Sequence, residues 1–342
     1  MVEPIPAQKR PYVVPWSDEA QEVMAGDLVT AFAYGTPAGG TVTIPVSPTG
    51  LVDRHLGSVG VTTSLAFNGK LRHILRDPHV AMAYHTREHG FATTDGFVLA
   101  QGTATVPLTP SPEVLDALKP RIERFLGAMP TGRFWDWVLG DYLDNRVVID
   151  IAVRRIASWP DGHAAGGLSV SGASWPGQQP DAQEAPAKGT GPRVDTRKLY
   201  GQVTKLPHQL LSWRGADGYP CVVPARVAGH DAQGLRLETA PGLLPEGGRR
   251  AGFTAHSFGP KAVGLSNRIC TGWLKVTGGT IVYAPHTTSG FTAPPVKPVQ
   301  LFFNGMFAKQ GWRKARREGT LAELAEIQST RPAVTVSRSE GA

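Results

Sequence analysis

The stretch TTSLAFNGKLRHILRDP, residues 62–78, decides how the rest of the chain is interpreted. A strand end rich in threonine is followed by a short loop and then by a helix that Pro78 terminates. The helix has an apolar stripe at helical spacing, made of Leu71, Ile74 and Leu75. Free N–H groups at a helix start, a nearby Lys70 and hydroxyl groups on the preceding strand are what a phosphate monoester needs. These residues alone leave two interpretations open: an ordinary surface helix, or a socket for a cofactor phosphate.

Short segments rich in β-branched and aromatic residues surround this stretch and are separated by Gly and Pro. In the first half the predicted strands are residues 28–36, 41–48, 57–64, 79–86, 96–108 and 146–159. Helices are predicted at residues 17–27, 68–77 and 111–128, the first with Ser17 as its N-cap. A parallel doubly wound sheet needs a helix after nearly every strand, and the chain has no room for them. We therefore expect a mainly β protein built on a small antiparallel barrel with flanking helices.

The second half repeats the start of the first. HQLLSWRGADGYPCVVPARV (208–227) and LVTAFAYGTPAGGTVTIPVS (28–47) both contain an apolar strand, a Gly turn and a strand with an internal Pro. The turn glycine precedes that proline by six residues in both, as Gly39 and Pro45 show in the first half. Two related barrels in tandem are predicted, and chance similarity between two strand-rich halves is the alternative.

A segment rich in Gly, Ala, Pro and Ser, residues 158–196, is expected to be a flexible linker because it has little apolar area to bury. It divides the chain into an N-terminal barrel, residues 1–157, and a C-terminal barrel, residues 197–342. A basic amphipathic helix at residues 307–327 is expected to pack on the second barrel with its charges solvated, and contact with a phosphate, a nucleic acid or a membrane is the alternative. The aromatic run at residues 134–137 is expected to plug a barrel end.

Composition narrows the class of protein. The formal net charge of +7 either favours acidic ligands such as phosphates or only keeps the protein soluble. The chain has two cysteines without a CxxC pair, which excludes a disulfide framework and favours a cytoplasmic protein. We find no signal peptide, no membrane-spanning stretch, no nucleic-acid-binding motif and no hydrolase, P-loop or Rossmann motif. We therefore expect a small-molecule substrate and neither a nucleic-acid nor a membrane partner.

The segment YHTREHGF, residues 84–91, holds His85 and His89 at a spacing that suits a metal on a helix. The segment is predicted as strand and turn, and no further ligand follows, so we expect no metal site. His85 and Arg87 are candidates for contact with an anionic substrate, and a solvated loop is the alternative.

The run from GTVTIPVSP through the opening stretch to FVLAQGTATV resembles the flavin-binding split β-barrel superfamily. That superfamily includes pyridoxamine 5'-phosphate oxidase-like proteins and coenzyme F-420-dependent reductases. The matching positions are Lys70, Arg72, Asp77, Pro78, Val80, Gly102 and Ala104. The resemblance covers roughly residues 25–110 well and residues 200–285 in outline. It implies two split β-barrels in tandem and a flavin- or deazaflavin-dependent oxidoreductase.

The resemblance also implies a cofactor site. The cofactor, FMN or the deazaflavin F-420, would be held by its phosphate at Thr63, Ser64 and Lys70, with Arg72 as a further contact. Its ring system would lie along Thr43, Pro45 and Val46, and Gln101 would approach a polar edge of the ring. The cofactor carries the redox chemistry, so no catalytic side chain is named.

In this superfamily the cofactor lies between two barrels, which implies a homodimer or a pseudo-dimer within one chain. The second half has no lysine seven residues after Thr239, so it is expected to serve as a wall of the first site. Two other hypotheses remain. One is a haem-binding or haem-degrading protein with His85, His89 or His256 as axial ligand, and the other is a non-enzymatic binding or sensor protein.

Overall fold

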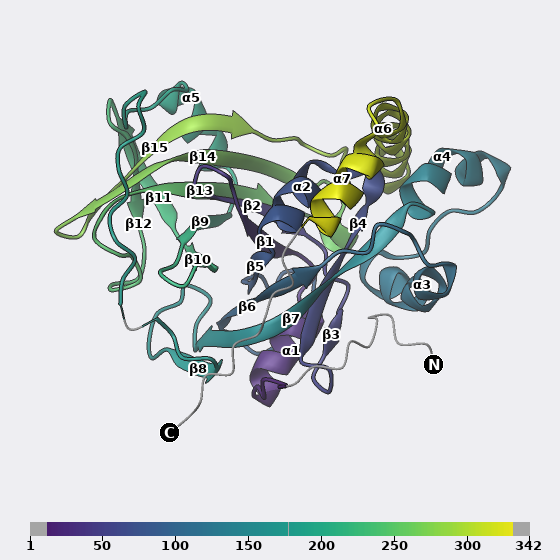
Figure 1. The fold of residues 1–342 in the computed structure, drawn as a ribbon, viewed down its shortest axis with the longest axis horizontal. Coiled ribbons are helices and arrows are strands. Elements are labelled where there is room, and N and C mark those ends of the chain that lie inside the picture. The colour runs from purple at the N-terminus through teal and green to yellow at the C-terminus, as the bar shows by residue number, and fades with distance from the viewer. Residues whose placement is uncertain (1–11, 177, 331–342) are drawn as a thin grey trace.

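The structure is a computed structural model that describes residues 12–176 and 178–330. Two antiparallel sheets lie next to each other, one from each half of the chain (Figure 1). The first consists of β1 (Thr30–Gly35), β2 (Thr41–Val46), β3 (Val52–Asp53), β4 (Ser58–Ser64), β5 (His79–Tyr84), β6 (Phe97–Thr105), β7 (Arg146–Trp159) and β8 (Ser169–Gly172). The second consists of β9 (His208–Arg214), β10 (Pro220–Pro224), β11 (Arg226–Asp231), β12 (Gly234–Glu238), β13 (Gly247–Ser257), β14 (Ser266–Thr277) and β15 (Thr280–Ser289).

The two sheets have the same topology. The first follows the order β2-β1-β5-β6-β7-β4-β3, with β8 added to β7, and the second follows β10-β9-β13-β14-β15-β12-β11. Numbered from the first strand of each sheet, both orders are 2-1-5-6-7-4-3. The predicted fold class is therefore confirmed: the chain is mainly β with flanking helices, and two split-barrel units follow one another.

Helices surround the sheets. They are α1 (Asp18–Gly26), α2 (Gly69–Arg76), α3 (Pro112–Leu126), α4 (Arg133–Leu143), α5 (Thr196–Val203), α6 (Lys297–Arg317) and α7 (Thr320–Ser329), with 3-10 turns η1 (Leu65–Phe67) and η2 (Pro260–Ala262). The Ser17 hydroxyl accepts a hydrogen bond from Ala20 N at 3.2 Å and caps α1, as predicted. The predicted stripe of α2 is buried in the first core, and the helix ends at Arg76, before Pro78.

Large and small side chains alternate along β1 and β5, and the small ones let the two sheets approach closely. Phe32 and Met82 face the first core, whereas the intervening Ala31 and Ala83 pack against Leu210 of the second half. Small side chains on the outer face remove the bulk that would otherwise separate the sheets. The sheets therefore share a buried apolar contact.

Polar contacts join the same surfaces. The Thr43 hydroxyl donates to Ser212 Oγ at 2.8 Å, and the Arg155 guanidinium pairs with Asp217 at 2.6 Å. A Cβ on Gly252 would lie 2.7 Å from the carbonyl oxygen of Thr41, so only glycine permits this approach. The interface is specific as well as apolar.

The described residues of the expected linker make ordered contacts. β8 pairs with β7, and Trp175 packs against the second core and the apolar contact between the sheets. Gln183 accepts a hydrogen bond from Arg250 N at 2.9 Å and donates to the Gly39 carbonyl at 3.0 Å. The composition of residues 158–196 suggested flexibility, but partners distant in sequence hold the segment on both sheets. The division of the chain at residues 157 and 197 stays a prediction.

The predicted packing of the C-terminal helix on the second barrel is wrong. Ala308, Trp312 and Leu324 belong to the first core, and α6 and α7 lie beside α2 and α4 (Figure 1). Gly305 and Gly311 have no room for a Cβ, because backbone atoms of Val138 and Ala66 occupy that space. These small residues let α6 lie close to α4 and η1, and they explain its choice of surface.

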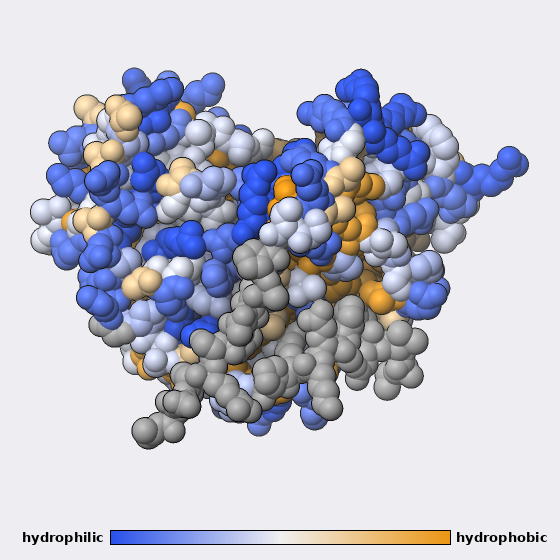
Figure 2. Space-filling view, in the orientation of Figure 1, coloured by the Kyte–Doolittle hydropathy of each residue, from blue (hydrophilic) through white to orange (hydrophobic). Residues whose placement is uncertain are grey.

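The surface shown in Figure 2 is mostly hydrophilic, with hydrophobic side chains visible around α7. The aromatic run at residues 134–137 does not plug a barrel end. It begins α4, and both Phe134 and Trp137 are 56% exposed. Among the described residues, no helix is both long and apolar enough to cross a membrane.

Candidate functional site

An open cavity of about 420 Å³ lies at the N-terminal end of α2. It is bounded by β2, by the turn from η1 into α2, and by the second half of α6. The lining residues are Ile44, Ala66, Phe67, Asn68, Gly69, Lys70, Arg72, Gly311, Lys314, Ala315 and Glu318. Three of these side chains are cationic and one is anionic, so the cavity favours an anionic ligand.

The local sequence explains why α2 opens toward this cavity. Ser64 ends β4, and its hydroxyl accepts a hydrogen bond from Ala66 N at 3.3 Å, which starts η1. The first turn of α2 contains no acidic residue, and its N-cap Asn68 makes no side-chain capping bond. The positive end of the helix dipole therefore faces the cavity without a carboxylate of its own.

Lys70 is the central residue of the cavity. Burial, together with the positive charge of the nearby Arg146, lowers the pKa of its ammonium group to about 8. Within the described residues, this ammonium makes no hydrogen bond or ion pair. A desolvated cation without a protein partner gains most from an anion that enters beside it.

Arg72 also lines the cavity, but its guanidinium is already paired. It holds Glu323 of α7 in a two-pronged arrangement, with Nε 2.9 Å from Oε1 and Nη2 2.7 Å from Oε2. Hydrogen bonding to Arg72 lowers the pKa of Glu323. The structure therefore brings Lys70 and Arg72 to one cavity, where the arginine already has an internal carboxylate partner. That the two residues bind a cofactor phosphate stays a prediction.

The hydroxyl groups predicted to hold the phosphate are placed differently. Thr63 and Ser64 are buried beside the cavity rather than in its lining. The Thr63 hydroxyl donates to the Ser64 carbonyl at 3.4 Å, and Ser64 caps η1. Both residues shape the turn that presents Lys70.

The strand predicted to lie along the cofactor ring is β2. It contributes Ile44 to the cavity instead of the predicted Thr43, Pro45 and Val46. Thr43 points to Ser212 of the second sheet, and its carbonyl accepts from Thr254 at 2.6 Å. Pro45 and Val46 are half-buried and do not line the cavity. Alternation along β2 explains why Ile44, one residue from Thr43, reaches the cavity wall.

Gln101 has no free polar group for a ring edge. Its side-chain amide donates to the Pro220 carbonyl at 2.7 Å, and its oxygen accepts from Arg155 Nε at 2.7 Å. The side chain is completely buried between the sheets. Its function is to join the two halves.

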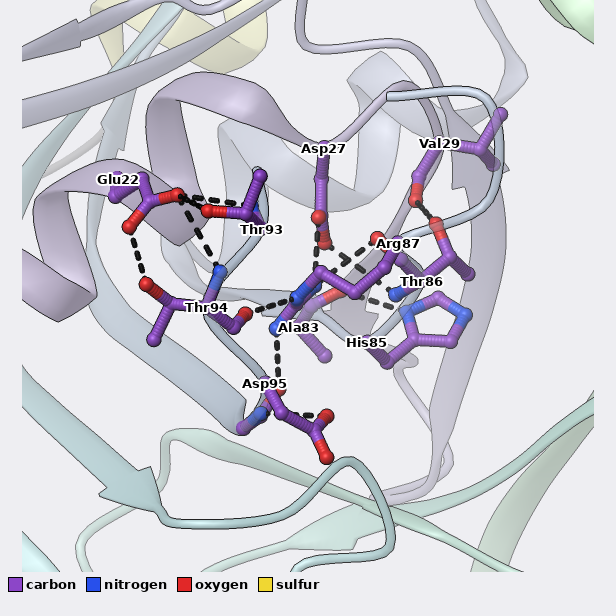
Figure 3. A network of polar contacts seen from close by, with 11 residues as sticks. Glu22, Asp27, Val29, Ala83, His85, Thr86, Arg87, Thr93, Thr94 and Asp95 are labelled. Carbon is purple, nitrogen blue, oxygen red and sulfur yellow. Dashed lines mark hydrogen bonds and ion pairs between the residues drawn. The ribbon is translucent and has the colours of Figure 1, made fainter. Parts of the chain in front are cut away.

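The guanidinium of Arg87 makes its contacts within the first unit (Figure 3). Its guanidinium pairs with Asp27 at 2.6 Å and donates to the carbonyls of Thr94, at 2.8 Å, and Gly96. Burial raises the pKa of the Asp27 carboxyl to about 7, against the opposing charge of Arg87. The guanidinium N–H groups are used to fix the loop after β5.

His85 belongs to a cluster of histidines between the two sheets. Its Nε2 lies 2.8 Å from Nε2 of His256, and its Nδ1 lies 3.0 Å from the Ala83 carbonyl. The ring of His208 is centred 5.0 Å from that of His256. Burial lowers the pKa of all three, that of His85 to about 3. Neutral histidines with these contacts serve as interface residues.

The described part of the second half differs from the first in the segment that corresponds to η1 and α2. In the first half β4 leads through η1 and α2 to β5, whereas β12 leads to β13 through a loop without a helix. Arg249, the cation that follows there, is buried and donates to the Pro180 carbonyl at 3.0 Å. The cavity at α2 thus has no equivalent built from these second-half elements.

Sequence reasoning missed the contribution of the C-terminal helices. Lys314 and Glu318 line the cavity, and Glu323 holds Arg72. The small residues of α6, Gly305, Ala308 and Gly311, are a signal of close packing that would have placed this helix against another element.

No protein-family model matches the sequence, and no curated protein matches it. Among solved structures, a heme-binding protein from Mycobacterium smegmatis is 13% identical with a TM-score of 0.32, covering 86% of this chain and 99% of the other. A conserved hypothetical protein from Mycobacterium tuberculosis is 21% identical with a TM-score of 0.31, covering 47% and 96%. A pyridoxamine 5'-phosphate oxidase-related FMN-binding protein from Nostoc punctiforme is 8% identical with a TM-score of 0.28, covering 58% and 87%. The solved structures similar to this chain include two whose descriptions name pyridoxamine 5'-phosphate oxidase.

Proposed function

We propose that the cavity at α2 binds the phosphate of a flavin or deazaflavin cofactor, FMN or coenzyme F-420. The protein then acts as an oxidoreductase that transfers hydride or electrons to a small organic substrate. The observation that carries this proposal is the position of Lys70: its half-buried side chain lines the cavity at the start of α2, and its ammonium makes no hydrogen bond or ion pair within the described residues.

The residues present fit the phosphate end of such a cofactor. Lys70 and Lys314 provide two positive charges, and the first turn of α2 provides backbone N–H donors. Arg72 becomes a further donor if Glu323 moves away. Ile44 and Phe67 provide apolar surface in the same cavity, as a planar ring system requires.

The residues that line the cavity indicate which functions the protein and the cofactor would each supply. The bound cofactor supplies reversible hydride or electron transfer. Lys70 and Lys314 hold and orient it through its charged end, while Ile44 and Phe67 exclude water from one side. Since the cavity involves α2, we expect one cofactor per chain, with the second sheet supporting β2 from behind.

A haem-binding function is less well supported by the geometry. The Nε2 atoms of His85 and His256 face each other at 2.8 Å, and the His208 Nε2 lies 3.3 Å from a Glu88 oxygen. None of these three histidines lines the cavity at α2. A non-enzymatic binding protein would keep the same cavity and lack turnover.

Absorbance of the purified full chain, before and after incubation with FMN, F-420 or hemin, tests the proposal. We expect retained FMN or F-420 that inorganic phosphate at high concentration competes away. Stable binding of hemin with a Soret band, without binding of either other cofactor, would contradict it. Binding without reduction of any acceptor would support the non-enzymatic alternative.

A further inference from the structure

Helices α4 and α6 together expose an unusual amount of aromatic surface. This surface, aromatic except for Val299, consists of Phe134, Trp137, Val299, Phe302, Phe303 and Phe307, which are between 36% and 56% exposed. The rings of Phe134 and Phe302 stack with their centroids 6.4 Å apart, so the two helices form one continuous surface. Contiguous exposed apolar residues of this kind mark an interaction site.

The outer face of α6 changes character along its length. Residues 299, 303, 306, 310, 313 and 317 follow one another at steps of four and three, so they share one line along the helix. Val299 and Phe303 begin this line, and the exposed Arg313 and Arg317 end it. The exposed face of α6 is therefore apolar along its first half and cationic along its second half.

The charge on α6 is of one sign. Its 21 residues include no Asp or Glu, and its cations are Lys297, Lys309, Arg313, Lys314, Arg316 and Arg317. The inner side of the helix is occupied by packing on α4 and η1. The outer side thus combines apolar rings with cations.

We propose that the outer face of α6, with the exposed end of α4, docks on an anionic phospholipid surface. The aromatic rings enter the headgroup region, and Arg313 and Arg317 contact the anionic headgroups. The α4 part of the face carries the exposed Asp136, but the α6 part carries cations only, so α6 paired with α6 about a two-fold axis would set cations against cations. Charge complementarity therefore favours an anionic phospholipid surface over a second copy of the chain. The proposal is independent of the cofactor.

Sedimentation of the full chain with sucrose-loaded vesicles tests it, using phosphatidylcholine with about one quarter phosphatidylserine. We expect the protein to sediment with these vesicles, to remain in solution with pure phosphatidylcholine, and to be released by high salt. The double variants Phe303→Ser/Phe307→Ser and Arg313→Gln/Arg317→Gln should each lower the partition coefficient on the order of tenfold.

Matched controls lie far from α6. Leu168, just before β8, is 41% exposed against 44% for Phe303, and β8 and α6 lie on opposite sides of the molecule (Figure 1). Leu168→Ser, and Lys198→Gln on α5, should sediment like the unchanged chain. Sedimentation that both double variants leave unaltered would overturn the proposal. It would also be overturned by a dimer in light scattering that Phe303→Ser/Phe307→Ser converts to a monomer, or by tighter binding to single-stranded nucleic acid than to vesicles.

Discussion

A single lysine carries most of the functional argument. The sequence placed Lys70 at the start of a helix after a strand rich in hydroxyl groups, and the structure places it in a cavity with Lys314 and without a bound carboxylate. Its neighbour Arg72 has the same charge but is held by Glu323. Arg72 has a carboxylate partner, whereas Lys70 has none within the described residues. An anionic ligand should therefore bind beside Lys70.

Because the pKa of Lys70 is lowered to about 8, cofactor binding above that pH should take up protons. A bound phosphate favours the charged ammonium and raises its pKa again. At pH 8.5 we expect an uptake of roughly three quarters of a proton per cofactor bound, measured by calorimetry in two buffers with different ionisation enthalpies. Lys70→Arg should bind without this uptake, since arginine stays charged. Equal uptake by both proteins would assign the proton to another group.

At the scale of elements, the C-terminal helices complete the cavity. α6 lies on η1 and α4 through small residues, and α7 supplies the carboxylate that holds Arg72. The wall of a site built from β2 and α2 in the first half is thus closed by residues more than 200 positions later in the chain.

Gly311→Ala should therefore destabilise the fold and disturb the cavity. The new Cβ would collide with the backbone oxygen of Ala66, and we expect a loss of about 1–3 kcal/mol in the free energy of unfolding. Gly201→Ala, in α5, meets open space and should add roughly 0.5–1 kcal/mol. Urea unfolding of the two variants and the unchanged chain measures both. An equal response at the two positions would show that α6 does not pack as described.

Glu323→Gln should strengthen anion binding. Removal of the carboxylate frees the Arg72 guanidinium and leaves the cavity more positive. The pair lies at the surface, where solvent screens it, so its loss should change stability little. Competition of phosphate with FMN should show a several-fold gain, whereas Glu326→Gln on the same helix should show none. A weaker binding of phosphate by Glu323→Gln would mean that Arg72 needs its partner to stay in place.

Local sequence patterns were sufficient to predict most strands and helices. They could not predict which side chains contact each other across long distances in the sequence. Periodicity and capping residues such as Ser17 were sufficient for the strands and the first helices. Gln101 and Arg87 were predicted as ligand contacts because their types suit that function. Their partners, Pro220 and Asp27, lie 119 and 60 residues away, and no local signal reveals them.

At the scale of the whole molecule, the two units have the same strand order but differ in the segments that connect the strands. The first unit has α2 and its lysine, and the second passes from β12 to β13 by a loop. Between them lies an interface of alanines, hydroxyl groups and the histidine cluster. The two units thus share a strand order, and the candidate site lies in the first.

The histidine cluster should make stability depend on pH. The pKa of His85, about 3, and those of His208 and His256 are lower than in an unfolded chain. Below pH 6.5 the unfolded chain binds more protons, so stability is present above that pH and falls as pH falls. Between pH 7 and 5.5 we expect a loss of about 1 kcal/mol from His85 alone.

Urea unfolding at the two pH values tests this dependence. His85→Asn should flatten it, and replacement of the exposed His55 should not. Asp27, whose pKa burial raises to about 7, acts in the opposite sense, so each variant is compared with the unchanged chain. A slope unaffected by His85→Asn would exclude the cluster as its origin.

The affinity of FMN and of F-420 for the full chain, for Lys70→Ala and for Lys198→Ala tests the central claim most directly. Loss of a charge-assisted contact to phosphate should weaken binding of the preferred cofactor about tenfold or more in Lys70→Ala. Lys198, exposed on α5, serves as the control of equal charge and should leave the affinity unchanged. Equal affinity of the unchanged chain and Lys70→Ala for the cofactor would contradict the assignment of this cavity.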